Sequence, residues 1–360
     1  MPNGSSILIV GAGDLGLRIA LRCAAVAGIH RIWLAGRNPA RGHVDASLID
    51  ACSVGATVAF RHIDALDEEA MSALLCELQP DALVQCASMH SPWLLRESSG
   101  PAAEALLRAG FASELSAQLP IAVSVLSAAH RIGFDGPIVN CSYPDVVNAV
   151  LHRIGIAPTF GIGNAGMIHM LAQSALRARG ERRKLHTLAH HAHVSMTATL
   201  RFPIDPSRST PRFFLDGEEH APTSVFANAR AIATDRRLNE ITTAHAVSMI
   251  QSYLGLAPEL STSAPGVFGM PGGWPVTVAR GAIDLDFPSG ITRQDVLGFN
   301  QEAARMDGAA DIDDDGTVHF TDRLCAELRP RWPQLAAPLA PCDGMLRYRT
   351  LHAAIRAEAM

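Results

Sequence analysis

Short apolar runs alternate with longer amphipathic segments through the first part of the chain. The runs have the length of buried strands, and the segments between them have the length of helices. The predicted strands cover residues 7–10, 31–36, 56–64, 81–88, 137–143 and 159–164. The predicted helices cover residues 15–28, 39–54, 67–78, 113–132 and 145–155. Such alternation is typical of a doubly wound parallel sheet with helices on both faces, so we predict an α/β domain over residues 1–165.

Residues 89–112 interrupt this alternation. They contain Trp93 and a Ser-Ser-Gly-Pro break that ends at Pro101. Long loops in compact domains are often lids or binding loops. We therefore predict an active-site loop here, in which His90 and Arg96 cover a substrate and Arg96 contacts an anionic group.

The pattern changes after residue 165, where a second domain is expected over residues 166–360. Strand-like alternation covers residues 184–202, helical periodicity covers residues 242–255 and 291–308, a strand pair is predicted over residues 273–287, and an Asp-Gly hairpin over residues 313–321. We predict a mixed α/β (α+β) domain that carries the substrate, catalytic and oligomerisation functions.

Composition narrows the class of partner. The chain is 48% hydrophobic and 18% charged, as in a globular enzyme. Its net charge of −5 and the absence of a basic block argue against nucleic acid and membrane as partners. Seven scattered cysteines without a C-x-x-C pair indicate reduced thiols. No apolar stretch has the length of a membrane span and no basic leader precedes the first strand, so we expect a cytoplasmic protein that binds a small molecule.

The sequence G-A-G-D-L-G at residues 11–16 matches G-x-G-x-x-G between an apolar strand and an apolar helix. Gly11 allows the tight turn, Gly13 lets the backbone approach a pyrophosphate, and Gly16 lets the helix pack closely on the strand. Asp14 and Leu15 begin that helix, whose N-terminus offers N–H groups to phosphates. The turn predicts a Rossmann domain that binds a nicotinamide dinucleotide.

The end of the second strand indicates which dinucleotide is bound. Enzymes that use NAD usually place Asp or Glu there to accept hydrogen bonds from the ribose. This chain has Gly36, Arg37 and Asn38 instead. Arg37 could pair with a 2′-phosphate, which favours NADP over NAD. The alternative is that Arg37 is a solvated turn residue in a protein that uses NAD.

Other strand ends supply further candidates, because ligands of doubly wound sheets lie beyond the carboxyl ends of the strands. Ala87 and Ser88 end the fourth strand and are expected to run past the cofactor. Asn140 and Asn164 end the fifth and sixth strands and could hydrogen-bond the nicotinamide ribose or carboxamide.

Five segments resemble the lactate/malate dehydrogenase superfamily, which also contains NAD-dependent redox glycosidases. They are IVNCSYPDVVNAVL (138–151), TFGIGNAGMIHMLAQSAL (159–176), LAHHAHVSM (188–196), TTAHAVSMIQSYL (242–254) and GGWPVTVARGAIDLDF (272–287). The resemblance implies a Rossmann domain followed by a catalytic domain, and a homo-oligomer. A second resemblance, through the G-R-N at the end of the second strand, is to saccharopine dehydrogenase-type NADP-binding domains and covers only the first domain.

The chain departs from that superfamily at two positions. The Asp-x-x-Arg of the dehydrogenases, which orients the catalytic His and binds a carboxylate, is absent from residues 165–169. The metal-binding Cys of the glycosidases is replaced by Gly163. Both a simple 2-hydroxy-acid dehydrogenase and a standard redox glycosidase are therefore at odds with these residues.

Residues 188–196 contain a cluster of three histidines, His190, His191 and His193. Because imidazole titrates near neutral pH, this cluster is the best candidate for acid–base catalysis. On a strand His191 and His193 would share one face, and the pattern does not choose between them. Tyr143 could donate to a substrate oxygen or line the nicotinamide pocket. A metal bound by the His-x-His pair with His169 or His90 is the alternative, but no acidic residue at suitable spacing supports it.

The sequence thus predicts an NADP(H)-dependent oxidoreductase that transfers hydride to or from a small polar keto, imine or hydroxy compound. Two other functions stay open. One is a redox-acting lyase or glycosidase that recycles its NAD(P) within each turnover. The other is a non-enzymatic dinucleotide-binding sensor.

Overall fold

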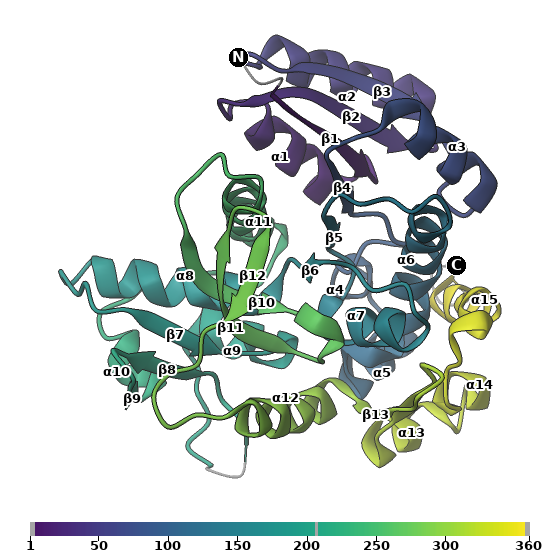
Figure 1. Cartoon of the computed structure of the whole chain (residues 1–360). Helices are drawn as coiled ribbons and strands as arrows, with labels where there is room; N and C mark the ends of the chain where they lie inside the picture. The colour runs from purple at the N-terminus through teal and green to yellow at the C-terminus, as the bar shows by residue number, and fades with distance from the viewer. Residues whose placement is uncertain (1–3, 206–207, 357–360) are drawn as a thin grey trace.

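Six parallel strands form the sheet predicted for the first part of the chain (Figure 1). The computed structural model describes residues 4–205 and 208–356. In chain order the strands are β1 (Ser5–Val10), β2 (Ile29–Gly36), β3 (Thr57–His62), β4 (Ala82–Gln85), β5 (Ile138–Asn140) and β6 (Phe160–Gly161). Their order in the sheet is β3-β2-β1-β4-β5-β6. The chain adds β2 and β3 on one side of β1 and then β4, β5 and β6 on the other, so the order of connection reverses between β1 and β4. Doubly wound folds bind ligands beyond the strand ends at such a reversal.

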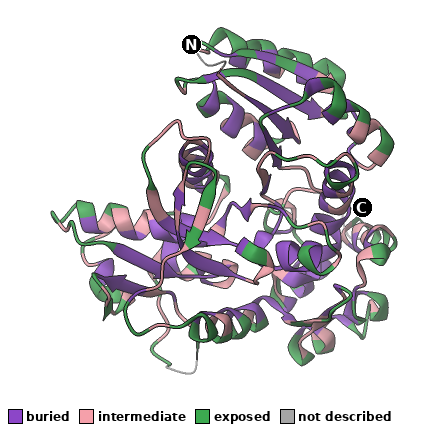
Figure 2. Cartoon of the chain, viewed as in Figure 1, coloured by how far each residue is buried: buried purple, intermediate pink, exposed green. Residues whose placement is uncertain are grey.

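Helices cover both faces of this sheet. The helices that the periodicity predicted are α1 (Asp14–Cys23), α2 (Pro39–Ala51), α3 (Glu68–Leu78), α6 (Leu115–Arg131) and α7 (Pro144–Arg153). Alternate residues of a strand point to opposite faces, and on β1 Leu8 belongs to one hydrophobic core whereas Ile7 belongs to the other. The strands are accordingly buried and the outer sides of the helices exposed (Figure 2). The predicted doubly wound parallel sheet is confirmed.

The segment over residues 89–112 is not one long loop. It contains α4 (Leu94–Glu97), α5 (Pro101–Ala109) and the start of a short 3₁₀ helix, η1 (Phe111–Glu114). The Ser-Ser-Gly-Pro break is the start of α5, because proline fixes φ at a value that suits the first turn of a helix. The predicted loop conformation was therefore wrong for most of this segment, whereas its place beside an active site stays a prediction.

The segment Phe111–Arg131, which contains α6, is long and apolar enough to cross a membrane by length and composition alone, with a mean hydropathy of 1.2. However, 83% of that stretch is buried inside the protein. α6 packs against α3 and α7, so its apolar side chains are used in the core. Core helices of this kind pass the same test.

Two antiparallel sheets follow β6, with the orders β7-β8-β9 and β10-β11-β12. Their elements are α8 (Asn164–Arg177), β7 (Leu185–Leu188), α9 (Val194–Thr199), β8 (Arg212–Leu215), β9 (Glu218–His220), α10 (Pro222–Val225), α11 (Asn239–Tyr253), β10 (Leu260–Pro265), β11 (Gly273–Ala279), β12 (Ala282–Leu285) and α12 (Arg293–Asp307). The predicted mixed α/β character of this part is confirmed.

Residues 184–202 do not form the single strand that the alternation predicted. β7 ends at Leu188, and His191–His193 form a 3₁₀ helix, η2, before α9. The turn is held by reciprocal capping: the Ala192 N–H donates to His190 Nδ1 at 3.2 Å, and the His190 N–H donates to His193 Nδ1 at 3.1 Å. His191 and His193 therefore do not share a strand face.

The C-terminal part packs back on the first domain (Figure 1). It comprises the predicted hairpin, β13 (Ala309–Ile312) and β14 (Val318–Phe320), and then α13 (Asp322–Leu328), α14 (Pro333–Ala336) and α15 (Gly344–Arg356). α13 lies against α5, and α15 lies against α6. The domain boundary near residue 165 remains a prediction.

Candidate active site

The turn between β1 and α1 is closely packed at two of its three glycines. Gly11 has φ +109°, and a Cβ there would lie 2.6 Å from the backbone nitrogen of Ala87. A Cβ on Gly16 would lie 2.0 Å from the carbonyl oxygen of Gly11. A Cβ on Gly13 would meet no atom within 4 Å. Gly11 and Gly16 therefore shape the turn, whereas Gly13 leaves bare backbone at an open space.

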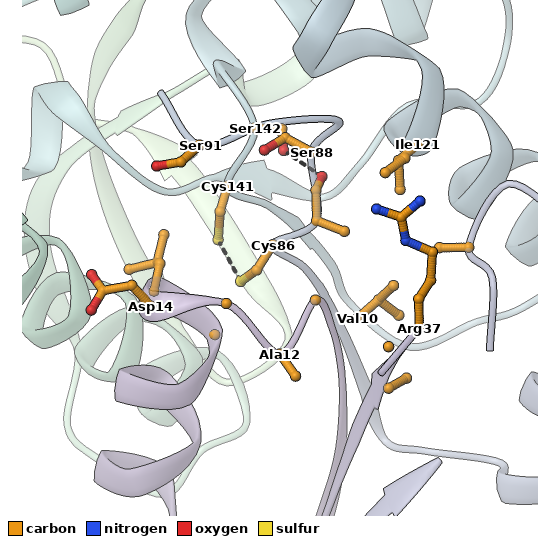
Figure 3. Close-up of a pocket in the computed structure, with 18 of the residues that line it drawn as sticks. Val10, Ala12, Asp14, Arg37, Cys86, Ser88, Ser91, Ile121, Cys141 and Ser142 are labelled. Carbon is orange, nitrogen blue, oxygen red and sulfur yellow. Dashed lines mark hydrogen bonds between the residues drawn. The ribbon is translucent and has the colours of Figure 1, made fainter. Parts of the chain in front are cut away.

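That open space is a cavity of about 410 Å³ over the carboxyl ends of the central strands (Figure 3). Most of the predicted cofactor-binding residues line it. They are Gly11, Gly13, Asp14, Leu15, Gly16, Gly36, Arg37, Asn38, Ala87 and Ser88. The first turn of α1 also opens here, and the N–H groups of a first turn have no acceptor within the helix. The cavity thus lies where doubly wound folds bind ligands, and it is lined by backbone donors suited to phosphate.

The cavity is cationic where β2 ends. Arg37 lines the cavity and extends toward Ile121 (Figure 3). Arg37 has no ion-pair partner among residues 4–205 and 208–356, whereas the neighbouring Arg41 pairs with Asp45 at 3.2 Å. Asn38 accepts a hydrogen bond from the Arg41 N–H and so caps α2. The free charge of Arg37 is therefore available to an anionic group.

A second cavity, of about 200 Å³, continues from the first. The two cavities share Leu15, Pro92, Trp93, Gln118, Cys141 and Asn239. Trp93, Met167, Val194 and Leu238 give the second cavity apolar walls, and Asn164 lies among its polar lining. Arg96 is the one arginine or lysine among its described lining residues.

His191 and Asp307 form a hydrogen-bonded pair in the wall of the second cavity. His191 Nδ1 lies 2.7 Å from Asp307 Oδ2, and both side chains are largely buried. The ring of Phe111 stacks on the imidazole at 4.3 Å between centroids. The hydroxyl of Tyr143 donates to the same carboxylate oxygen at 3.3 Å. His191 Nε2 has no partner among the described residues and is the ring nitrogen left for a ligand.

The pair shifts the protonation of its members. Burial lowers the pKa of His191, but the adjacent Asp307 carboxylate outweighs it, so that this pKa is raised above the usual value. Burial acts to raise the pKa of Asp307, yet its interactions with His191 and His190 leave this pKa below the usual range. The pKa of Tyr143 is raised well above its ordinary value, first by burial and then by the Asp307 charge. Of the three groups, only His191 has a pKa shifted in the direction that favours its charged form while it can still act as a base.

A second buried carboxylate, Asp145, positions the histidine turn. The backbone N–H of His191 donates to Asp145 Oδ1 at 3.0 Å, and Asn164 Nδ2 donates to Asp145 Oδ2 at 3.2 Å. Asp145 lies in the first turn of α7, where a negative charge suits the helix dipole. Tyr143 caps the same helix in a left-handed conformation with φ +42°. One helix start therefore places both Tyr143 and Asp145.

Two predicted site residues lie away from both cavities. His193 is fully buried, its Nε2 lies 3.2 Å from Ser209 Oγ, and its pKa is lowered to about 3 by burial and by His190. Asn140 is also fully buried, and its Nδ2 donates to Asn148 Oδ1 at 2.7 Å. His193 and Asn140 therefore line neither cavity, and the structure does not bring them to the candidate site. Asn164 was predicted as a cofactor contact, but it lines the second cavity and not the first.

The histidines considered for a metal are engaged elsewhere. His169 Nδ1 lies 3.1 Å from Thr187 Oγ1, and His90 Nε2 lies 3.0 Å from Glu114 Oε2. Burial and neighbouring histidines lower the pKa of His169 to about 3. Within the part of the chain that the structure describes, no three or more His, Cys, Asp or Glu side chains form a group suited to a metal ion.

Sequence reasoning missed Asp145 and Asp307. Asp307 ends α12, and a negative charge is unfavourable at a helix C-terminus unless a partner compensates it. That position was a usable signal for a functional carboxylate. Asp145 follows Pro144 in the first turn of the predicted helix. Acidic residues are common in the first turn of helices, so nothing in the sequence marked this one as functional.

The sheet order, the glycine turn and the cavity at the reversal point place the protein in the class of Rossmann folds with an appended α+β domain. Within that class, the fold is that of the lactate and malate dehydrogenases, as the resemblance predicted. The sequence matches no protein-family model, and no curated protein is similar to it.

Three solved structures illustrate the likeness. The minor L-lactate dehydrogenase of Enterococcus mundtii has a TM-score of 0.53 and 14% identity, over 84% of this chain and 96% of its own. The lactate dehydrogenase of Cryptosporidium parvum, in complex with lactic acid and nicotinamide adenine dinucleotide, has a TM-score of 0.52 and 15% identity, over 85% and 98%. The malate dehydrogenase of Archaeoglobus fulgidus, in complex with NADH, has a TM-score of 0.51 and 13% identity, over 84% and 97%.

Proposed function

We propose that this protein is an NAD(P)-dependent oxidoreductase that transfers hydride between the cofactor and a small polar keto, imine or hydroxy compound. One observation carries the proposal: the cavity at the glycine turn continues into a second cavity whose wall holds the His191–Asp307 pair. When hydride is transferred to or from a carbon, a side chain must give a proton to, or take one from, the oxygen or nitrogen bonded to that carbon. The structural neighbours that bind NADH or NAD support the same assignment.

The residues at the first cavity fit a dinucleotide. The bare backbone at Gly13 and the first turn of α1 would hold the pyrophosphate. Arg37, without an ion-pair partner in the described part of the chain, would pair with a 2′-phosphate, so we favour NADP(H) over NAD(H). When bound, the nicotinamide accepts or gives the hydride. Its reactive end belongs at the junction of the two cavities, beside Cys141 and Gln118.

His191 handles the proton. His191 Nδ1 donates a hydrogen bond to Asp307 Oδ2 at 2.7 Å. Nε2 is then the ring nitrogen that accepts the proton of a substrate hydroxyl in the second cavity. In the reverse direction the imidazolium gives that proton to the carbonyl oxygen. The carboxylate stabilises the imidazolium and fixes the ring, as in other histidine–carboxylate pairs. Stacking on Phe111 limits rotation of the ring.

The second cavity limits the substrate to a small molecule. Its volume of about 200 Å³ suits a small molecule. Met167 lies in the cavity, on the helix where the dehydrogenases carry their Asp-x-x-Arg. Arg96 would be the contact for an acidic group of the substrate.

The test combines binding with turnover. Purified protein is titrated with NADPH and NADH separately, and is then assayed with NADP⁺ or NAD⁺ against a panel of small alcohols, hydroxy acids and amines. His191→Gln and Asp307→Asn should bind the cofactor normally and reduce turnover by about 10²- to 10⁴-fold. The matched controls are His319→Gln and Asp313→Asn, which alter a largely exposed pair 2.7 Å apart.

Each outcome has a clear meaning. Failure of both nucleotides to bind would overturn the proposal. Activity that needs only catalytic NAD(P), without net cofactor reduction, would support the redox lyase or glycosidase. Tight binding with no turnover across the panel would support a dinucleotide sensor.

Homo-oligomerisation is proposed on the sequence resemblance, and a cytoplasmic location is proposed on the composition. Gel filtration with light scattering tests the assembly.

A further inference from the structure

Two cysteines lie side by side in the cofactor cavity. Cys86 directly follows β4, and Cys141 directly follows β5, the neighbouring strand. Their Sγ atoms are 3.5 Å apart (Figure 3). Both residues line the first cavity, and Cys141 also lines the second. The two thiols therefore border the place where the cofactor and the substrate would meet.

The backbone at this point suits a disulfide. Neighbouring strands lie about 4.8 Å apart, and disulfides join Cα atoms about 4.4 to 6.8 Å apart. β4 and β5 are paired in register up to Gln85 and Asn140, the residues immediately before the two cysteines. Formation of the bond requires the sulfur atoms to approach to about 2.05 Å, mainly by side-chain rotation. No other pair of cysteines in residues 4–205 and 208–356 lies within hydrogen-bonding distance.

We propose that Cys86 and Cys141 are a modification site: they form a reversible disulfide, and the disulfide and a bound dinucleotide oppose each other. With a low-molecular-weight disulfide as oxidant, one thiolate attacks RSSR and releases RSH. The second thiol then displaces the other RS group, so that two protein thiols and RSSR give one protein disulfide and two RSH. The protein sulfur atoms are oxidised and the small disulfide is reduced.

The opposition follows from packing around Cys86. The next residue, Ala87, has backbone atoms less than 3 Å from where a Cβ of Gly11 would be. Ser142, which follows Cys141, donates through its hydroxyl to the Ala87 carbonyl at 2.9 Å. Rotating the Cys86 and Cys141 side chains into the bond therefore changes the lining of the cavity beside the surface on which the glycine turn rests.

Cys86 should be slow to form a thiolate in the resting protein. Its hydrogen bond with Cys141, followed by burial, raises the pKa of Cys86 well above its usual value. The thiolate is the form that attacks a disulfide. The pair therefore oxidises under sustained oxidising conditions or at alkaline pH.

The first experiment measures the modification without any enzymatic activity. The whole protein is equilibrated with glutathione and glutathione disulfide at several ratios, free thiols are alkylated, and peptides are analysed by mass spectrometry. We expect a peptide linked through Cys86 and Cys141 with the loss of two hydrogens. Cys86→Ser and Cys141→Ser should each abolish it, and Cys342→Ser, at an exposed cysteine, should not. Mixed disulfides alone, or a different linked pair, would overturn the proposal.

The second experiment measures the opposition to the dinucleotide, and this part rests on the proposed function. Reduced and oxidised protein are titrated with NADPH and NADH, and we expect weaker binding to the oxidised form by a factor in the range of about 5 to 150. By linkage, a tenfold difference raises the reduction potential of the pair by about 30 mV at saturating nucleotide. Equal affinity of the two forms would overturn the proposal that the disulfide weakens dinucleotide binding. If neither form binds nucleotide, both the proposed function and this part of the inference fail. The mass spectrum still decides whether the disulfide forms.

Discussion

Asp307 Oδ2 lies 2.7 Å from His191 Nδ1, although 116 residues separate the two along the chain. The carboxylate comes from the end of α12, and Asp145 at the start of α7 holds the backbone of the same histidine. This arrangement supplies an orienting acid that the helix after β6 does not carry. It also gives the pair a pH dependence that can be measured.

The rate of substrate oxidation should rise with pH and level off above a midpoint higher than 6.5, because oxidation needs a neutral imidazole and the pKa of His191 is raised above 6.5. Reduction should show the opposite dependence, since it needs the imidazolium. Asp307→Asn removes the main interactions that raise this pKa and leaves burial, which lowers it, so the midpoint should fall. kcat/KM measured against pH tests this, and an unchanged midpoint in the variant would contradict it.

Tyr143→Phe should move the same midpoint upward. The tyrosine hydroxyl donates to Asp307 Oδ2 at 3.3 Å, and its removal leaves the carboxylate charge less stabilised and more attractive to the imidazolium. The free energy of unfolding should fall by about 0.5 to 3 kcal/mol. Tyr348→Phe is the control, because that hydroxyl donates to the Met89 carbonyl and does not touch the pair. A downward shift of the midpoint in Tyr143→Phe would count against this account.

Gly13→Ala and Gly16→Ala should separate binding from stability. A methyl group on Gly13 meets no protein atom within 4 Å and projects into the cavity, so the fold should keep its stability while dinucleotide affinity falls at least about tenfold. A methyl group on Gly16 would overlap the Gly11 carbonyl oxygen. That variant should lose about 1 to 3 kcal/mol of unfolding free energy. Denaturant unfolding and nucleotide titration measure both, and normal binding by Gly13→Ala would place the pyrophosphate elsewhere.

Arg37→Asp should reverse the preference between the two nucleotides. A charge-assisted hydrogen bond is worth about 1.5 to 3 kcal/mol, so NADPH affinity should fall by about 10- to 150-fold while NADH binding is kept or improved. Arg31→Asp, on the exposed part of β2, is the control for added negative charge. An equal loss of affinity for NADPH and NADH would show that Arg37 does not distinguish them by binding the 2′-phosphate.

The first domain was predictable because most of its central strand residues are buried and two of its helices are capped by residues next to them in sequence. Asn38 and Asp67 each accept a hydrogen bond from the first turn that follows them, and both lie where the periodicity began a helix. The glycine turn could be recognised from its spacing, because Gly16 meets the carbonyl oxygen of Gly11 within the turn itself. Local rules therefore sufficed for most of the sheet and for the glycine turn, whereas the approach of Ala87 to Gly11 is a contact between distant residues.

The catalytic half was less predictable because its geometry is set over long distances. The histidine segment alternates like a strand, but imidazole side chains cap a 3₁₀ turn that no propensity indicates. α5 was taken for loop because Gly100 and Pro101 begin it, and the same residues commonly end helices. The Asp307 partner could not be paired with His191 from sequence, since nothing local links α12 to η2.

Met167 lines the second cavity from α8, while His191 and Asp307 come from η2 and α12. In the proposed reaction, a side chain that borders the substrate and the pair that moves the proton are thus on separate stretches of chain. A substitution of Met167 would reshape the cavity while His191 keeps its contact with Asp307. Under the proposed function, such a division would let new substrates be acquired by single substitutions without loss of the acid–base pair.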